Sequence, residues 1–108
     1  MKPKIKRTDF GDCWFYNYSK YRFALYRYSD SPKSLYLANV EVFERYRNNG
    51  LGNLILRKAD HYAKRKKASE LFLKCETGCW VSGWYKRNGF KHFSDEENFE
   101  WLRKEIQY

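Results

Sequence analysis

The stretch from residue 34 to residue 67 constrains the fold more than any other part of the chain, because its hydrophobic pattern changes half-way along. Residues 35–42 are a short run of the residue types that suit a pleated surface, so they predict a β-strand. After a polar loop at residues 43–49, apolar side chains recur at the spacing of one helical face: Leu51, Leu54, Ile55, Ala59, Tyr62 and Ala63. The order strand, loop, helix is therefore predicted.

Two glycines, Gly50 and Gly52, flank one residue where this helix is expected to begin. A glycine lets a ligand approach the backbone closely, and the first amides of a helix have no intrahelical partner and favour anions. This junction between loop and helix is therefore a candidate phosphate-binding site, although a glycine pair alone also fits a simple tight loop. A dinucleotide fingerprint is excluded because its third glycine is replaced by Ile55, and a P-loop is excluded because Asn53-Leu54 stands where Lys-Ser/Thr is required.

A second motif stands nearer the C-terminus, at residues 84–90, WYKRNGF. Together with residues 42–52, VFERYRNNGLG, it makes the chain resemble the GCN5-related N-acetyltransferase (GNAT) family. The first segment fits that family's acetyl-coenzyme A signature, and the second fits its aromatic-Tyr-x-x-x-Gly-Phe signature. One helix, a strand at residues 70–76 and a short helix separate them, in the family's order. Two linked motifs at consistent spacing are more specific than either alone.

The resemblance implies an α/β fold of the acyl-CoA N-acyltransferase type, in which a mixed, mostly antiparallel sheet has splayed central strands and flanking helices. At 108 residues the chain is expected to be one domain, residues 1–108. The aromatic segments 14–18 and 21–28 predict two strands joined by a hairpin turn. The family usually has a strand and two helices ahead of them. Here we expect a trimmed fold that lacks these elements, with residues 1–11 as a basic N-terminal tail.

The net charge of +9 is unevenly spread along the chain. Residues 1–34 and residues 35–67 each carry eight Lys or Arg against three acids, whereas residues 68–108 carry six against seven. The positive potential of residues 1–67 attracts polyanions, including nucleic acid and the phosphates of coenzyme A, but it is not specific for any of them. The interleaved tyrosines and arginines of the first strands can also stack on single-stranded RNA, but a sheet face packed under a helix is the favoured interpretation.

The composition, with 43% hydrophobic and 20% aromatic residues, is that of a folded protein. Because no apolar run is long enough to span a membrane and the basic residues 1–7 have no apolar continuation, we expect a cytoplasmic protein without membrane attachment. Three cysteines in such a chain are expected to be reduced thiols. Cys75 and Cys79 are four apart, but Cys13 and the two histidines complete no recognised zinc spacing, so we expect no metal site.

The resemblance implies that acetyl-CoA is the co-substrate. Its pantetheine arm is expected along the central strand at residues 40–42, where that strand separates from the strand at 71–75, and its pyrophosphate on the backbone amides of residues 47–53. The cofactor-binding residues expected on this basis are Val40, Val42, Arg47, Asn48, Asn49, Gly50, Leu51, Gly52 and Asn53. There is one departure from the family's pattern: an Asn often found seven residues before the motif tyrosine is Gly78 here, and Thr77 or Ser82 is the candidate substitute.

The resemblance also assigns catalytic roles. The backbone N–H of Val42 is implied as the oxyanion donor and Tyr85 as the general acid for the departing thiolate. Glu41 is a candidate base, with a water relay as the alternative, and a β-bulge in the strand would change the face on which it lies. For both side chains a structural role stays open: Tyr85 as a packed helix residue and Glu41 as a solvent-facing strand residue.

Three classes of function follow. The first is an N-acetyltransferase that moves an acetyl group from acetyl-CoA to a primary amine by direct attack in a ternary complex, the acceptor being a small molecule, a protein or an aminoacyl-tRNA. The second is a catalytically inactive module of the same fold that binds a protein or nucleic-acid partner. The third is a small nucleic-acid-binding protein of unrelated fold, for which no recognised motif is present. An uncovered aromatic sheet also predicts a homodimer.

Overall fold

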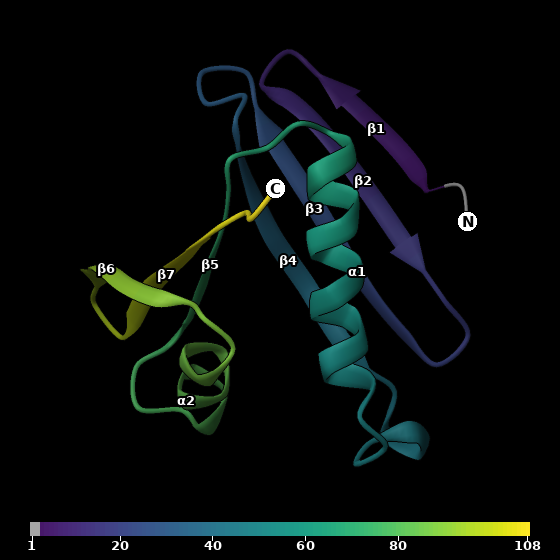
Figure 1. Cartoon of the computed structure of the whole chain (residues 1–108), viewed down its shortest axis with the longest axis vertical. Coiled ribbons are helices and arrows are strands. Elements are labelled where there is room, and N and C mark those ends of the chain that lie inside the picture. The colour runs from purple at the N-terminus through teal and green to yellow at the C-terminus, as the bar shows by residue number, and fades with distance from the viewer. Residues whose placement is uncertain (1–2) are drawn as a thin grey trace.

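The computed structural model of the chain describes residues 3–108 and places seven strands in one sheet, in the order β1-β2-β3-β4-β5-β7-β6 (Figure 1). Every neighbouring pair is antiparallel except β4 and β5, which are parallel. The predicted mixed, mostly antiparallel sheet is confirmed. The strands are β1 (Lys4–Thr8), β2 (Gly11–Asn17), β3 (Tyr21–Tyr28), β4 (Ser34–Val42), β5 (Glu70–Glu76), β6 (Lys91–Glu96) and β7 (Phe99–Glu105), and the helices are η1 (Glu44–Tyr46), α1 (Leu51–Arg65) and α2 (Trp80–Arg87).

The central strands β4 and β5 form a fork, as predicted. They pair only from Ser34↔Glu70 to Tyr36↔Phe72 and then diverge (Figure 1). A bulge in β4 accompanies the divergence: Asn39 has a φ of +54°, and the register with β3 shifts between Arg22 and Ala24. A bulge bends its strand and increases the local twist, so it turns the end of β4 away from β5.

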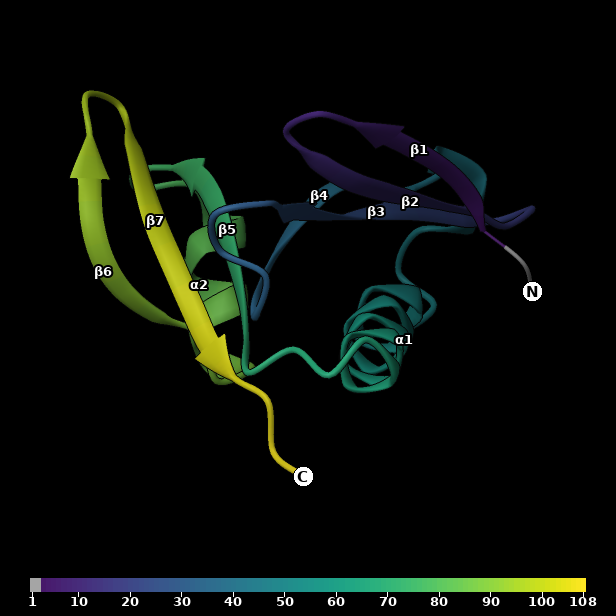
Figure 2. The same cartoon turned by 90° about the horizontal axis from the view of Figure 1, so that it is seen from above.

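Helices α1 and α2 lie on the same side of the bent sheet (Figure 2). Helix α1 buries Ile55, Leu56, Ala59 and Ala63, the apolar stripe that its 3.6-residue period predicts. These side chains pack into one core with strand residues that alternate toward the helices, among them Leu35, Leu37, Leu71, Leu73 and Leu102. The fork therefore opens between two helix-covered parts of the same sheet.

The prediction of a basic tail over residues 1–11, and of a fold without a first strand, is wrong for the described residues. Lys4–Thr8 is strand β1, paired with β2 from Lys4↔Phe15 to Thr8↔Gly11. All five residues are exposed, so the strand lacks the apolar alternation that identifies a half-buried one. No helix precedes β2 in residues 3–108, in agreement with the expected trimming. Met1 and Lys2 lie outside the described residues.

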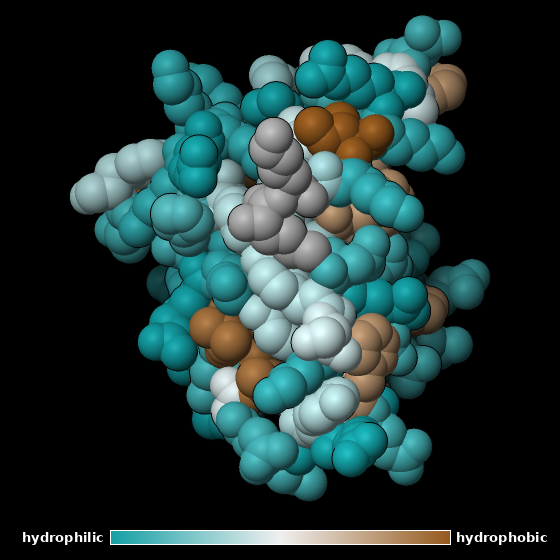
Figure 3. Space-filling view, turned by 90° about the vertical axis from the view of Figure 1, so that its right-hand side faces the viewer, coloured by the Kyte–Doolittle hydropathy of each residue, from teal (hydrophilic) through white to brown (hydrophobic). Residues whose placement is uncertain are grey.

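The surface on the side of the N-terminal hairpin is mainly hydrophilic, with a few separate apolar patches (Figure 3). The hairpin turn between β2 and β3 forms as predicted, closed by the Tyr18 N–H donating to the Tyr21 carbonyl at 2.9 Å. The loop after β4 differs from the expectation, because it contains the helical turn η1. No helix in the described part of the chain is long and apolar enough to cross a membrane.

Candidate functional site

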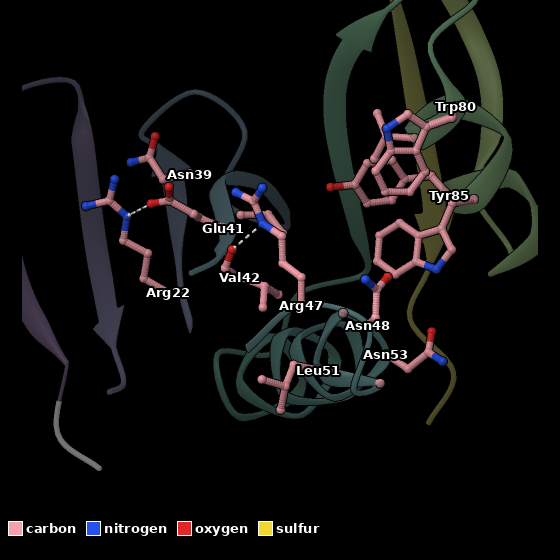
Figure 4. Close-up of a pocket in the computed structure, with 15 residues that line it drawn as sticks. Arg22, Asn39, Glu41, Val42, Arg47, Asn48, Leu51, Asn53, Trp80 and Tyr85 are labelled. Carbon is pink, nitrogen blue, oxygen red and sulfur yellow. Dashed lines mark hydrogen bonds and ion pairs between the residues drawn. The ribbon is translucent and has the colours of Figure 1, made fainter. Parts of the chain in front are cut away.

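A cleft of about 810 Å³ opens at the fork between β4 and β5 (Figure 4). The end of β4, the loop that follows it, the first turn of α1 and helix α2 supply most of its walls. All predicted site residues except Asn49 line this cleft. The lining residues are Arg22, Asn39, Val40, Glu41, Val42, Arg47, Asn48, Gly50, Leu51, Gly52, Asn53, Trp80, Val81, Trp84 and Tyr85.

The edge of β4 exposes peptide groups to the cleft. Along a strand, the N–H and C=O groups of one residue point to one side and those of the next residue to the other. Phe43 donates its N–H toward β3, to the Lys20 carbonyl at 3.0 Å, whereas the Val42 carbonyl accepts a 2.9 Å hydrogen bond from Arg47 Nε in the cleft. The N–H of Val42 therefore points into the cleft.

The first turn of α1 forms the floor of the cleft. Gly50 is the N-cap residue and adopts a left-handed φ of +74°, a conformation that favours glycine. No side chain caps the helix, and its first turn contains no acidic residue. The amides of Leu51, Gly52 and Asn53 therefore have no intrahelical acceptor and no carboxylate repels an anion from them.

Gly52 of α1 and Asn49 of the preceding loop make contacts within the protein that were not expected. A Cβ atom on Gly52 would lie 3.0 Å from Trp84 Cζ2, so this glycine allows the ring of Trp84 to pack against α1. Clearance for a phosphate is thus not the only reason for glycine at this position. Asn49 donates from Nδ2 to the carbonyls of Tyr46 and Arg47, both at 3.3 Å, and holds the loop instead of facing the cleft.

Glu41 lies at the β3 side of the cleft, where Arg22 holds its carboxylate. The distance from Arg22 Nε to Glu41 Oε1 is 2.8 Å, and both side chains are exposed, at 52% and 40% respectively (Figure 4). An exposed pair of this kind contributes little to stability. Arg22 thus occupies one of the two carboxylate oxygens with which Glu41 could contact an acceptor amine.

Tyr85 projects from α2 into the opposite wall. Its side chain is 7% exposed and packs against the rings of Trp84 and Phe90, with centroid distances of 4.9 and 5.4 Å. Its hydroxyl points toward the end of β4 (Figure 4). Burial, assisted by the neighbouring Cys75 and Tyr36, raises the pKa of Tyr85 to about 12. The phenol is therefore fully protonated at neutral pH and available as a proton donor.

A family model described as Acetyltransferase (GNAT) family matches residues 10–90, which is three quarters of the chain. The chain belongs to the GNAT acetyltransferase family. Solved GNAT structures share its fold. A GNAT family acetyltransferase from Elizabethkingia anophelis with acetyl-CoA bound has a TM-score of 0.71 at 18% identity, over 90% of this chain and 77% of that one. A Bacillus subtilis acetyltransferase in complex with CoA has a TM-score of 0.74 at 16% identity, over 92% and 79%.

A third structure, the PaiA N-acetyltransferase from Thermoplasma acidophilum in complex with coenzyme A, has a TM-score of 0.70 at 20% identity. The similarity covers 80% of this chain, but the chain spans only 53% of that protein. At such identities the likeness shows the GNAT fold alone. The function of this chain's own residues has to be argued from their geometry.

This GNAT chain has Gly78 where the family often has an asparagine, seven residues before the motif tyrosine. Gly78, at that position, has a left-handed φ of +76°, and a Cβ atom there would meet no atom within 4 Å. Thr77 and Ser82, the expected substitutes, do not line the cleft. Ser82 instead donates from Oγ to Glu100 at 2.5 Å, beneath α2.

A buried carboxylate anchors α2 and thereby positions Tyr85. Glu100 of β7 is 5% exposed and accepts hydrogen bonds from Ser82 and, at 2.9 Å, from Lys86 Nζ. These two bonds lower the pKa of the Glu100 carboxyl. Ser82 and Lys86 are four residues apart and so lie on one face of α2. This anchor, like the contacts of Arg22, Asn39 and Trp80 with the cleft, was not predicted, because it joins side chains that only the tertiary structure brings together.

The raised pKa of Tyr85 predicts a loss of stability at alkaline pH. An unfolded tyrosine has a pKa of about 10, so between pH 10 and 12 the unfolded chain releases a proton that the folded protein retains. Below pH 10 the folded protein keeps all of this stabilisation. The loss in the free energy of unfolding is about 1.4 kcal/mol at pH 11 and reaches about 3 kcal/mol once the pH passes 12. Urea unfolding at pH 8 and pH 11 measures it. Tyr85→Phe is the control, and an equal pH dependence in both proteins would contradict the assignment.

Proposed function

We propose that this GNAT protein transfers an acetyl group from acetyl-CoA to a primary amine by direct attack in a ternary complex. The observation that supports the proposal most is the meeting of three features in one cleft. These are the unpaired edge of β4 with the Val42 N–H directed inward, the uncapped first turn of α1, and the protonated hydroxyl of Tyr85. The bound acetyl-CoA and CoA named for two structures of the same fold agree with it.

The residues in the cleft fit the two polar parts of acetyl-CoA. The peptide groups of Val40 offer an amide-bearing arm the hydrogen bonds that a neighbouring strand would make. The Val42 N–H lies next along the same edge and faces the acetyl end, while the Val42 carbonyl already accepts from Arg47. The amides of residues 51–53 offer an anion site that no side chain or acidic residue occupies. Arg47 adds a positive charge at the same end. When bound, acetyl-CoA supplies a thioester, an activated acetyl donor.

The positions of these groups support the catalytic roles that we propose. The Val42 N–H is a fixed donor for the negative charge that develops on an acyl oxygen, the contribution that is usually largest in acyl transfer. Tyr85 donates its proton to the departing thiolate. An acceptor amine must lose a proton, and the two candidate bases are Glu41 and a water relay. Because Arg22 competes for that carboxylate, the water relay is the better supported of the two routes.

Binding of acetyl-CoA tests the proposal directly. A ligand present at 100 times its Kd stabilises the folded protein by about 2.7 kcal/mol, which corresponds to a rise in Tm of roughly 10 °C for a domain of this size. Calorimetric titration gives the Kd, and thermal unfolding at rising acetyl-CoA concentration gives the shift. Pantetheine, which lacks the pyrophosphate, is the control ligand and should bind at least tenfold more weakly than acetyl-CoA. If neither method detects acetyl-CoA at millimolar concentration, the enzymatic proposal fails and the binding-module hypothesis replaces it.

A further inference from the structure

Five aromatic side chains form a row across the face of the sheet opposite both helices. We call them the aromatic row: Phe15, Tyr26, Tyr36, Phe72 and Trp101. Successive ring centroids lie 6.3, 5.9, 5.3 and 6.1 Å apart. The register explains the row, because side chains alternate between faces and cross-strand partners share one. All five are half-buried, and the helices of the described chain pack on the other face (Figure 2).

The centre of the aromatic row lies beside the apex of the fork, where the cleft opens. Tyr36 and Phe72 are the last paired residues before β4 and β5 diverge, so the centre of the row lies at the apex of the fork. Burial raises the pKa of Tyr26, and the side chain of Asn39, which lines the cleft, lies close enough to Tyr26 to act on this pKa in the opposite direction. Tyr36 is also close enough to Tyr85 to contribute to the raised pKa of its hydroxyl. The row thus leads to the proposed point of acetyl transfer.

The other end of the row opens into a second cavity, of about 170 Å³. Four aromatic residues line it, Phe10, Phe15, Tyr26 and Tyr28, together with the charged residues Lys6, Asp12 and Arg27. Phe10 is 81% exposed and Tyr28 41% exposed. Exposed aromatic side chains beside a cavity are typical of a binding site for an apolar group.

The charges on the protein restrict what can bind there. Lys74 already lies over Phe99 and Trp101, at 4.6 and 5.5 Å from the ring centroids, so this end of the row has its own cation. Among residues 3–108, no Lys or Arg lies over the rings of the other four members of the row. The net charge of +9 repels polycationic acceptors. An uncharged ring that stacks on Tyr26 and Tyr36 satisfies both observations.

We propose that the acceptor is a primary amine carried by an aromatic or heteroaromatic ring with no further positive charge, the ring stacking on Tyr26 and Tyr36 and the amine reaching the apex of the fork. This inference rests on the proposed acetyl transfer. In that reaction the amine nitrogen forms a bond to the acetyl carbon and the carbon–sulfur bond breaks. The nitrogen of the ammonium form loses one proton to Glu41 or water before it attacks, and a second as the amide forms. The thiolate gains one proton from Tyr85, whose hydroxyl is restored by the second proton from the nitrogen.

The experiment compares 2-phenylethylamine with hexylamine, an alkylamine of similar length, and with spermidine, by measuring release of the CoA thiol. We expect kcat/KM for phenylethylamine to exceed that for either of the others by about tenfold, the value of one aromatic contact of roughly 1.4 kcal/mol. Tyr26→Leu should bring the phenylethylamine and hexylamine values together, whereas Tyr26→Phe should keep the preference because it keeps the ring. Phe93→Leu, an exposed aromatic residue of β6 outside the row, is the matched control and should change nothing.

A binding measurement separates this inference from the proposed function. Line broadening of phenylethylamine resonances is recorded without acetyl-CoA, in the wild type and in Tyr26→Leu. Broadening that disappears in Tyr26→Leu supports the aromatic site even if no acetyl-CoA binds and the enzymatic proposal fails. Equal transfer to hexylamine or spermidine, with acetyl-CoA bound normally, would overturn the inference. So would a dimer, detected by sedimentation, whose formation is abolished by Tyr26→Leu, because a second copy would then occupy the row.

Discussion

Replacing Tyr85 with phenylalanine is expected to lower kcat for acetyl transfer by about 100-fold, while the Kd for acetyl-CoA changes less than twofold. The phenol supplies the only proton donor that we assign to the leaving thiolate, and general acid catalysis commonly contributes between about 10² and 10⁴ in rate. Phenylalanine keeps the ring that packs against Trp84 and Phe90, so the wall of the cleft should remain intact. Steady-state kinetics and calorimetry measure the two quantities.

Tyr62→Phe is the matched control, because its hydroxyl bonds to Tyr18 at 2.8 Å and does not line the cleft. It should leave kcat within twofold of the wild type. With a pKa of about 12, Tyr85 stays protonated up to about pH 10, so the wild-type profile should show no alkaline decline from this group. An unchanged kcat in Tyr85→Phe would remove its assignment as the acid and leave water as the proton donor.

The parts of the fold that could be predicted share a strong local signal. The run of strand-forming residues in β4 and the period of 3.6 in α1 identify these two elements, because both signals lie within a short stretch of the sequence. The fork followed from the resemblance that residues 42–52 and 84–90 carry. These segments contribute backbone groups and a helix-borne phenol, whose placement depends mainly on the order of elements. That is why nearly all of the predicted residues line one cleft.

The parts that could not be predicted depend on contacts between distant residues. The bonding of Arg22 to Glu41 follows from the register of β3 with β4, which the bulge at Asn39 shifts. The fit of Trp84 against Gly52 depends on how closely α2 approaches α1. Strand β1 has no buried side chain, so only its backbone pairing with β2 reveals it. In each case the deciding interaction has no periodic signature in the sequence.

Gly11 opens strand β2, and its replacement by alanine is expected to destabilise the protein by about 3 kcal/mol. Its φ is +148°, and a Cβ atom there would lie 1.9 Å from the backbone oxygen of Arg27. Such a contact cannot be relieved by turning a side chain, so the start of β2 must separate from β3 and take β1 with it. A loss of this size lowers Tm by roughly 12 °C.

Alanine substitutions at two other glycines are the controls for Gly11→Ala. Gly78 also has a positive φ, but its Cβ position is empty, so Gly78→Ala should cost only about 1 kcal/mol for the left-handed conformation. Gly83 lies within α2, where a Cβ atom would meet only the flexible end of Arg87, so Gly83→Ala should stabilise the protein by about 0.5 kcal/mol. Urea midpoints should therefore rank Gly83→Ala above wild type, then Gly78→Ala, then Gly11→Ala. If Gly11→Ala is no less stable than Gly78→Ala, the first hairpin does not pack against β3 as described, because only that packing makes the methyl group intolerable.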